Sequence, residues 1–212
     1  MKKRISRKFW VSFGLLAVFG FWTAAVQWID VQPIGPGGSC VGFAGLNKAV
    51  HDFTGVHMPL YVLTDWLSLV PLGIALGFAL LGLWQWVRRK RLLAVDRSIL
   101  VLGGFYGAVM GVYALFETVV VNFRPVLLDG VLEPSYPSST TMLVLCIMPT
   151  AMLQLKGRIR QERARRGVML AMAAFTVFMV LGRLLSGVHW FTDIVGGALL
   201  SGGLVMLYCA AL

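Results

Sequence analysis

The stretch Arg183-Leu-Leu-Ser-Gly-Val-His-Trp-Phe-Thr-Asp193 places an arginine, a histidine and an aspartate between two long apolar segments. His189 and Asp193 are four residues apart, so on a helix their side chains lie on one face. There the carboxylate can accept one imidazole N–H and leave the other ring nitrogen free as a nucleophile. The spacing therefore predicts an oriented histidine at the end of a membrane helix.

Arg183 precedes His189 by six residues, which would point the two side chains apart on one continuous helix. We expect Ser186-Gly187 to break the helix and bring the two together, so that the guanidinium fork, which suits phosphate, lies beside the imidazole. A simpler interpretation also fits these residues. In that alternative a snorkelling arginine ends one helix and a structural His–Asp pair begins the next.

The composition indicates an all-α integral membrane protein. Of the 212 residues, 58% are hydrophobic and only 13% are charged. Several apolar runs approach or exceed the length needed to cross a bilayer, and no internal repeat is visible, so residues 1–212 form one predicted domain. Six transmembrane helices are expected at residues 9–29, 60–87, 98–121, 137–155, 167–185 and 190–212.

The net charge of +10 would suggest nucleic acid binding in a soluble protein, but its distribution along this chain argues against that function. All but three of the 19 basic residues fall at residues 2–8, 88–97 and 156–166. These segments share one side of the membrane if six helices alternate. The positive-inside rule makes that side cytoplasmic and places both termini there.

Most of the remaining ionisable residues, including seven of the nine acids, gather on the other, extracytoplasmic side. They include three basic residues, Lys48, Arg124 and Arg183, and all three histidines, His51, His57 and His189. Ionisable groups near membrane spans are costly, so these residues are the first candidates for function.

The first outer loop, residues 30–59, contains apolar residues at helical spacing between Val41 and Val56. This pattern predicts a short amphipathic helix that lies at the membrane surface or over the site. Two interpretations stay open. The helix is a surface element with a Lys48–Asp52 pair, or it is a lid that contributes Lys48 or His51.

Three polar clusters fall at the outer ends of the third to sixth spans: Arg124-Pro125, residues 137–140 and residues 183–193. Two arginines and a helix N-terminus that opens with hydroxyl residues can form a cradle for phosphate. Ser138 or Ser139 would cap the helix while its free N–H groups hold the anion. Alternatively, Pro137-Ser138 simply starts a helix.

The order and spacing of these clusters resemble the type 2 phosphatidic acid phosphatase family of membrane lipid phosphatases. That family carries Lys-x6-Arg-Pro, Pro-Ser-Gly-His and Ser-Arg-x5-His-x3-Asp. The third motif is present as Gly182-Arg183-x5-His189-x3-Asp193 and differs only at its first residue. The first keeps Arg124-Pro125 with Glu117 at the lysine position, and the second keeps Pro137-Ser138, followed by Ser139 and Thr140.

The resemblance implies a metal-independent lipid phosphatase that needs no cofactor. His189 would attack phosphorus and form a phosphohistidine, and Asp193 would orient the imidazole. Arg124, Arg183 and the backbone at residues 138–140 would stabilise the equatorial oxygens, and water would then hydrolyse the intermediate. The implied partners are a lipid phosphate or diphosphate and the bilayer of the cell membrane, with the active site on its extracytoplasmic face.

Two departures from the family pattern bear on catalysis. The family histidine replaced here by Thr140 protonates the leaving group, and a hydroxyl is too weak an acid for that role near neutral pH. Three explanations follow: His51 or His57 reaches in, the leaving group is a phosphate of a polyprenyl diphosphate that needs little help, or the protein is a weak or non-catalytic relative. Glu117 would repel phosphate, so we expect it to pair with an arginine or point elsewhere, while Lys48 supplies the missing cation.

Dephosphorylation of a lipid phosphate or diphosphate is thus the leading hypothesis. A lipid phosphotransferase would use the same site with a different acceptor. A non-catalytic lipid-phosphate binding or transport protein is the alternative from another class, although binding alone does not require an oriented nucleophile.

Overall fold

The computed structural model describes residues 2–212, with side chains from Arg7 onward. The described chain is all-α, and six of its helical segments are long and apolar enough to cross a membrane. The helices are α1 (Lys2–Trp28), α2 (Ala44–Thr54), α3 (Met58–Leu67), α4 (Leu69–Arg89), α5 (Arg97–Thr118), α6 (Ser139–Lys156), α7 (Glu162–Leu185) and α8 (Phe191–Ala211), with short 3-10 helices η1 (Pro36–Gly38) and η2 (Leu92–Ala94). The six predicted spans are confirmed to within a few residues at their ends.

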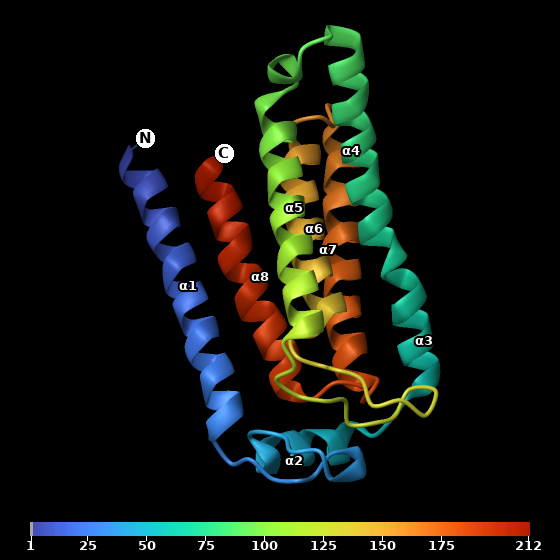
Figure 1. The fold of residues 1–212 in the computed structure, drawn as a ribbon. Helices are drawn as coiled ribbons and strands as arrows, with labels where there is room; N and C mark the ends of the chain where they lie inside the picture. The colour runs from blue at the N-terminus through green and yellow to red at the C-terminus, as the bar shows by residue number, and fades with distance from the viewer. Residues whose placement is uncertain (1) are drawn as a thin grey trace.

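The second span is one apolar segment, Met58–Arg89, but it consists of two helices that meet at Ser68. Pro71 lies just after this junction. Proline has no N–H to donate to the carbonyl four residues earlier, and its ring crowds that carbonyl, so the helix breaks one turn before it. The break gives α3 its own direction at the end of the bundle where α2 lies (Figure 1).

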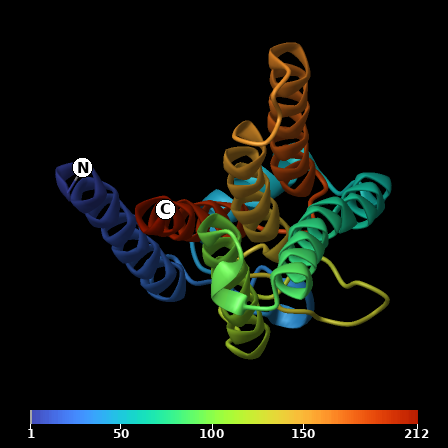
Figure 2. The ribbon, with the colours of Figure 1, turned by 90° about the horizontal axis from the view of Figure 1, so that it is seen from above.

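Helix α6 is the centre of the bundle. It contacts α4, α5, α7 and α8, and more of its length is buried than that of any other span in residues 2–212. Viewed from above, these four helices surround α6, and α1 lies outside against α8 (Figure 2). Val144, Cys146 and Ala151 of α6 are fully buried. The first turn of α6 is buried as well, at Thr140 and Thr141, so its free N–H groups are shielded from solvent.

Helix α1 packs closely on α8. Ser12 Oγ donates a hydrogen bond of 2.8 Å to the carbonyl oxygen of Gly203. A Cβ on Gly203 would lie 2.7 Å from the side chain of Leu16, so only glycine permits this approach. Trp22 Nε1 donates to the carbonyl of Thr192 at 3.2 Å, at the other end of the same contact.

The two ends of the bundle differ in character. Both termini, the α4–η2–α5 corner and the loop between α6 and α7 lie at one end (Figure 1), and this end carries the basic segments. Helix α2 and the loops that precede α6 and α8 lie at the other end. The predicted grouping of the basic segments is thus present in the fold, while the placement of that end in the cytoplasm stays a prediction.

The amphipathic helix predicted in the first loop is present as α2. Phe43 before it (φ 49°) and Gly55 after it (φ 69°) are both left-handed, which shortens the helix to Ala44–Thr54. Asn47 of α2 is fully buried, whereas Phe53 is 90% exposed. The helix therefore turns Asn47 toward α8 and Phe53 away from the bundle.

Candidate phosphate-binding site

A polar cavity of about 410 Å³ lies at the end of the bundle opposite the termini. Its walls come from the ends of α3, α5, α6 and α7 and from the loops before α6 and α8. Five of the predicted site residues line it: Arg124, Ser139, Thr140, Arg183 and His189. The fold thus brings together residues that are up to 65 positions apart in the sequence.

The predicted helix break between Arg183 and His189 is confirmed. Helix α7 ends at Leu185, and Gly187 has a φ of +69°, a conformation that favours glycine. A Cβ on Gly187 would lie 2.1 Å from the carbonyl oxygen of Gly55, so the loop before α3 also requires glycine here. The turn reverses the chain, and as a result Arg183 and His189 face the same cavity.

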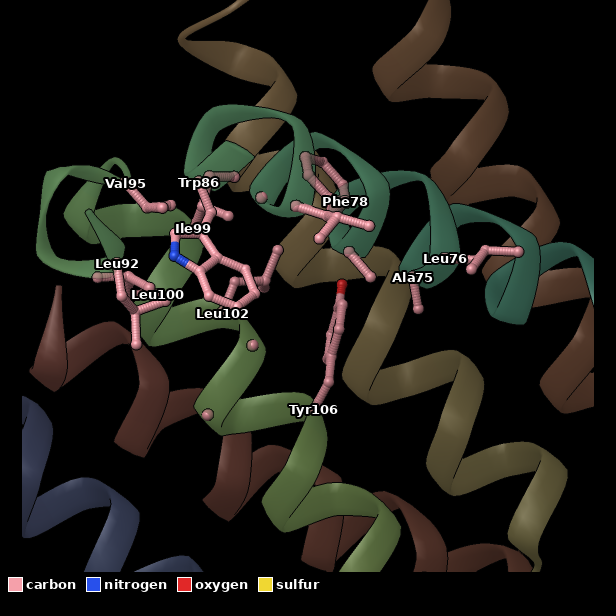
Figure 3. A pocket seen from close by; sticks show the side chains of 15 residues that line it. Ala75, Leu76, Phe78, Trp86, Leu92, Val95, Ile99, Leu100, Leu102 and Tyr106 are labelled. Atoms are coloured by element: carbon pink, nitrogen blue, oxygen red, sulfur yellow. The ribbon is translucent and has the colours of Figure 1, made fainter. Parts of the chain in front are cut away.

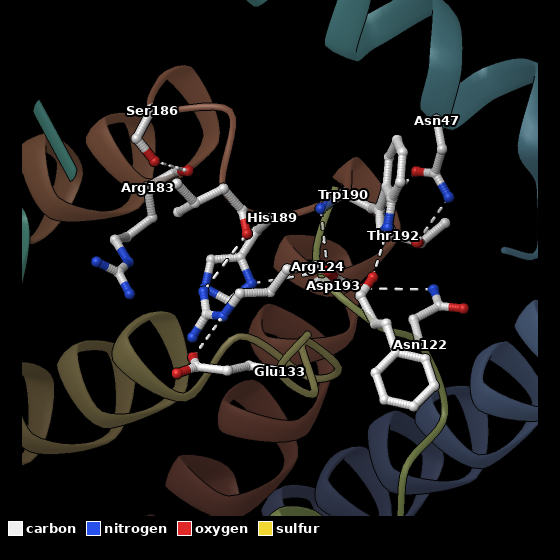
Figure 4. Close-up of polar contacts among 12 residues, drawn as sticks. Asn47, Asn122, Arg124, Glu133, Arg183, Ser186, His189, Trp190, Thr192 and Asp193 are labelled. Atoms are coloured by element: carbon white, nitrogen blue, oxygen red, sulfur yellow. Dashed lines mark hydrogen bonds and ion pairs between the residues drawn. The ribbon is translucent and has the colours of Figure 1, made fainter. Parts of the chain in front are cut away.

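His189 is almost completely buried, at 3% exposed. Arg124 Nη1 lies 3.2 Å from His189 Nε2 (Figure 4). Since a guanidinium only donates, Nε2 accepts and the ring proton belongs on Nδ1. Burial, and then the positive charges of Arg124 and Arg183, hold the pKa of His189 well below its ordinary value. The imidazole is therefore neutral at physiological pH, with the Nε2 lone pair directed toward Arg124.

Asp193 lies on the Nδ1 side of this imidazole. Its Oδ2 lies 3.6 Å from His189 Nδ1 and accepts the backbone N–H of Trp190 at 3.0 Å. The second contact closes the first turn of α8, as an acidic residue at the third helical position commonly does. Asn122 Nδ2 lies 3.5 Å from Asp193 Oδ1 on the far side (Figure 4). The carboxylate is thus fixed from two directions beside Nδ1.

Each arginine of the cavity is already engaged by a carboxylate. Arg124 Nε donates to Glu133 Oε2 at 3.1 Å. Arg183 Nη1 lies 3.6 Å from Asp65 Oδ1, and its guanidinium stands over the ring of Tyr61 at 4.9 Å. Arg183 is only 2% exposed, and its Nε has no hydrogen-bond partner among the described residues. A buried donor left without a partner favours an anionic ligand in this cavity.

Helix α6 presents its first turn to the cavity through Ser139 and Thr140, whose N–H groups have no acceptor within the helix. Ser138 does not line the cavity. It is fully buried, and its N–H donates to the carbonyl of Asp193 at 3.1 Å. Gly197 allows this contact, because a Cβ there would lie 3.2 Å from the carbonyl oxygen of Ser138. Ser138 therefore joins α6 to α8, while the two residues after it line the cavity.

The three residues predicted as auxiliaries lie elsewhere. Lys48 pairs with Asp52 at 2.8 Å on the exposed side of α2. His51 Nε2 donates to the carbonyl of Gly187 at 3.2 Å, and His57 Nε2 donates to that of Thr54 at 2.8 Å. The cavity wall contains none of the three. The orientation of α2 explains this result, since its buried edge contacts α8 rather than the cavity.

Glu117 also differs from expectation. It lines the cavity, but in residues 2–212 it forms no ion pair with either arginine. The pairing predicted for Glu117 is made by Glu133 and Asp65 instead. The cavity wall thus carries three carboxylates beside two arginines, which the arginine motifs alone did not reveal.

Two asparagines support the site and were not predicted as part of it. Asn47 donates to Thr192 Oγ1 at 3.0 Å and accepts the N–H of Thr192 at 3.1 Å, which ties α2 to the start of α8. Asn122 contacts Asp193 as described. The sequence pointed to Asn122 only through its position two residues before the Arg124-Pro125 pair.

The family model of the PAP2 superfamily matches residues 106–211, half of the chain. This protein belongs to the PAP2 superfamily. The matched segment contains Arg124, the start of α6, Arg183, His189 and Asp193, so it covers the PAP2 cavity except for its wall from α3.

The fold agrees with this assignment. A solved structure described as the first transmembrane PAP2 type phosphatidylglycerolphosphate phosphatase from Bacillus subtilis is similar to this chain with a TM-score of 0.55. The similarity covers 94% of each chain at 20% identity and concerns the fold. No curated protein sequence matches the chain. Within residues 2–212 of this PAP2 protein, no group of three or more His, Cys, Asp or Glu side chains is arranged to hold a metal ion.

Proposed function

We propose that this protein removes phosphate from a lipid phosphate or diphosphate through a phosphohistidine on His189. The observation that carries the proposal is the state of this imidazole. It is buried and neutral, its Nε2 faces Arg124 at 3.2 Å, and its Nδ1 lies beside Asp193. A binding protein needs the arginines but gains nothing from a neutral histidine oriented in this way.

In the first step the Nε2 lone pair of His189 attacks phosphorus. A nitrogen–phosphorus bond forms, and the phosphorus–oxygen bond to the leaving group breaks, with its electron pair passing to the leaving oxygen. The imidazole gains positive charge, which Asp193 stabilises through the proton on Nδ1. The resting separation of 3.6 Å is long, and such contacts commonly shorten only in the substrate complex.

The cavity supplies donors for the charge that develops on the phosphoryl oxygens. Arg124 and Arg183 approach from two sides, and the N–H groups of Ser139 and Thr140 face the same space. Preorganised donors of this kind stabilise the transition state more than the ground state when they are shielded from water. The carboxylates of Glu133 and Asp65 give up their arginines when phosphate enters.

In the second step a water oxygen attacks the phosphohistidine, the nitrogen–phosphorus bond breaks and inorganic phosphate leaves. The electron pair returns to Nε2 of His189, and one proton of the water is released. If a lipid or sugar hydroxyl replaced water, the same site would act as a phosphotransferase.

The leaving group decides which lipid is turned over fastest. Thr140 lines the cavity, and its hydroxyl cannot supply a proton near neutral pH. A lipid phosphate that leaves from a diphosphate is much less basic than an alkoxide and needs no acid. We therefore infer that a polyprenyl diphosphate is a better substrate than phosphatidic acid.

The test is phosphate release by purified protein from a polyprenyl diphosphate, phosphatidic acid and phosphatidylglycerol phosphate. His189→Asn should lose all release above background. The matched control is His57→Asn, because His57 lies outside the cavity wall and should keep full turnover. If no lipid releases phosphate while both proteins bind lipid phosphate equally, the protein is a binder and the catalytic roles above are wrong.

We also propose that the cavity opens on the extracytoplasmic side. Cys40 provides the probe, because it is exposed in the loop before α2, at the cavity end, while Cys146 is buried within α6. A membrane-impermeant maleimide should label the wild type in intact cells but not Cys40→Ser. Labelling that appears only after the cells are opened would reverse the orientation.

A further inference from the structure

A second cavity, of about 620 Å³, lies between α4 and α5 toward the end of the bundle that carries the termini. Its volume falls within the range of roughly 300–1,000 Å³ that is typical of ligand pockets. The wall is apolar and contains no charged residue. Phe78 and Trp86 of α4 face Leu102 and Tyr106 of α5 across it (Figure 3).

The cavity exists because two helices that meet at one end separate along their length. At the corner they are close, since a Cβ on Gly82 would lie 3.0 Å from Ile99. Farther along α5, a Cβ on Gly103 or Gly104 would have nothing within 4 Å. No side chain of the described chain fills this space. We call this cavity the α4–α5 groove.

The corner that adjoins the groove through Leu92 and Val95 is strongly basic. The α4–η2–α5 corner exposes five cations, namely Arg88, Arg89, Lys90, Arg91 and Arg97. In residues 2–212, only Arg89 among them has a carboxylate partner, Asp96 at 3.0 Å. A sixth cation approaches the wall from the loop after α6, where the guanidinium of Arg158 stands 6.0 Å from the ring of Phe78.

We propose that the α4–α5 groove binds one anionic phospholipid of the surrounding bilayer, with an acyl chain in the groove and the phosphate on the basic corner. Apolar walls accept the chain, and clustered Arg and Lys beside a membrane helix attract anionic headgroups. At the same corner Arg88 stands 5.2 Å from the ring centroid of Trp84, which lies outside the groove wall, and such Arg–Trp pairs are typical of the membrane interface.

The charge also argues against a second copy of this chain as the occupant. A two-fold dimer presents the same patch on both subunits, so two basic corners would face each other. Like charges brought together in this way oppose association. The groove lies at the opposite end of the bundle from His189, so the proposal is independent of the catalytic one.

The proposal predicts selective stabilisation by anionic lipid. The protein is purified in dodecyl maltoside, and its melting temperature is measured with added dioleoyl phosphatidylglycerol or dioleoyl phosphatidylcholine. Phosphatidylglycerol should raise the melting temperature by about 3 °C more than phosphatidylcholine does, a shift within the range for a ligand of modest affinity on a chain of this length. Equal shifts with the two lipids would overturn the proposal.

Matched variants locate the effect. Gly104→Leu places a side chain in the groove without a clash, whereas Gly111→Leu adds the same side chain to the same helix outside the groove wall. The first should abolish the selective shift and the second should keep it. A shift that survives Gly104→Leu would place the lipid elsewhere.

The headgroup has its own pair of variants. Arg88→Gln with Arg91→Gln should reduce the difference between the two lipids at least by half. Arg160→Gln in the loop after α6 with Arg163→Gln in the first turn of α7 is an equal charge change and should leave the difference unchanged. Equal losses in both pairs would mean that net charge alone is responsible. A native mass spectrum should show one bound phosphatidylglycerol on a monomer; a dimer without lipid would identify a second copy as the occupant.

Discussion

Helices α5 and α8 both carry glycines that suggest close helix packing, but only those of α8 are used for it. A Cβ on Gly196 or Gly203 would lie within 2.7 Å of a neighbouring side chain. A Cβ on Gly107 or Gly111 of α5 would meet nothing within 4 Å. Both helices thus contain several glycines, but only those of α8 face closely packed neighbours.

Polar contacts account for the difference. The α8 glycines lie between hydrogen bonds that join helices, from Ser12 to the carbonyl of Gly203 and from Ser138 to the carbonyl of Asp193. In a bilayer no hydrophobic effect pushes helices together, so packing and such hydrogen bonds decide which faces meet. Between α4 and α5 the comparable contact, from Gln85 to Asp96, lies at the corner and not on the open glycine face, which is the space we propose for lipid.

The largest effect should come from removing a charged side chain at the cavity end of the bundle, where α8 is closely packed. Arg183→Gln removes a guanidinium that lines the cavity, and turnover should fall about 10²–10³-fold, as when a preorganised donor is lost from an active site. The measurement is phosphate release under saturating substrate. Arg88→Gln at the other end is the control and should change turnover less than about twofold, within the effect of an ordinary surface substitution.

Next in size is a direct comparison of the two glycine faces. Gly196→Leu forces a side chain into the ring of Tyr136, which a Cβ would approach to 2.6 Å, and should destabilise the protein by about 1–3 kcal/mol. Gly107→Leu adds the same side chain to open space. Thermal unfolding in detergent should show a lower midpoint for the first and none or a small change for the second. Equal losses would mean that the open face is packed in solution.

A smaller loss is expected at the contact between α2 and α8. Asn47→Ala leaves the buried N–H and hydroxyl of Thr192 without their partner. Such a loss costs about 1–3 kcal/mol, and we expect a value near the lower end because water can enter the space left by the side chain. The midpoint of thermal unfolding measures this loss. Gln32→Ala, which removes an exposed contact with Asp30, is the control and should be neutral.

The smallest expected change concerns pH. A histidine with the ordinary pKa of about 6.5 loses about threefold of its neutral form between pH 7 and 6. Because burial and the two arginines lower the pKa of His189, its imidazole stays neutral over this range, and turnover should change less than about twofold. Arg124→Gln removes one positive charge, so the acidic limb of its profile should move to higher pH. An acidic limb of the wild type centred near 6.5 would contradict the assignment.

The lowered pKa of His189 also makes the free energy of unfolding depend on pH. The unfolded chain binds a proton at this histidine more readily than the folded chain does, so folding stability should decrease as the pH falls through the ordinary histidine range.

Much of the fold could be predicted because hydropathy and charge act along the chain. The six spans, the common end of the basic segments and the break at Gly187 all follow from local composition. The gathering of Arg124, Arg183 and His189 followed from motif order. Each of these predictions needed only to know which end of a span a residue occupies.

The remaining features depend on rotation about a helix axis and on the path of the loops, which sequence patterns do not fix. Helix α2 buries Asn47 and exposes Phe53, and this single rotation removes Lys48 and His51 from the cavity. The engagement of Arg124 by Glu133 is similar, because the loop before α6 folds back on itself before it enters the helix.

Glu133 and Asp65 pair with the two arginines of the cavity, so an anionic ligand would have to compete with these carboxylates. In the proposed reaction, phosphate that enters the site exchanges with Glu133 and Asp65 instead of meeting unpaired positive charge, so part of its attraction to the arginines is lost. The same exchange runs in reverse at the end of a cycle. Inorganic phosphate, small and without a lipid tail to hold it, is displaced by side chains that are already within 3.1 Å and 3.6 Å of their arginines. In the proposed reaction such a site would bind its product weakly and release it quickly.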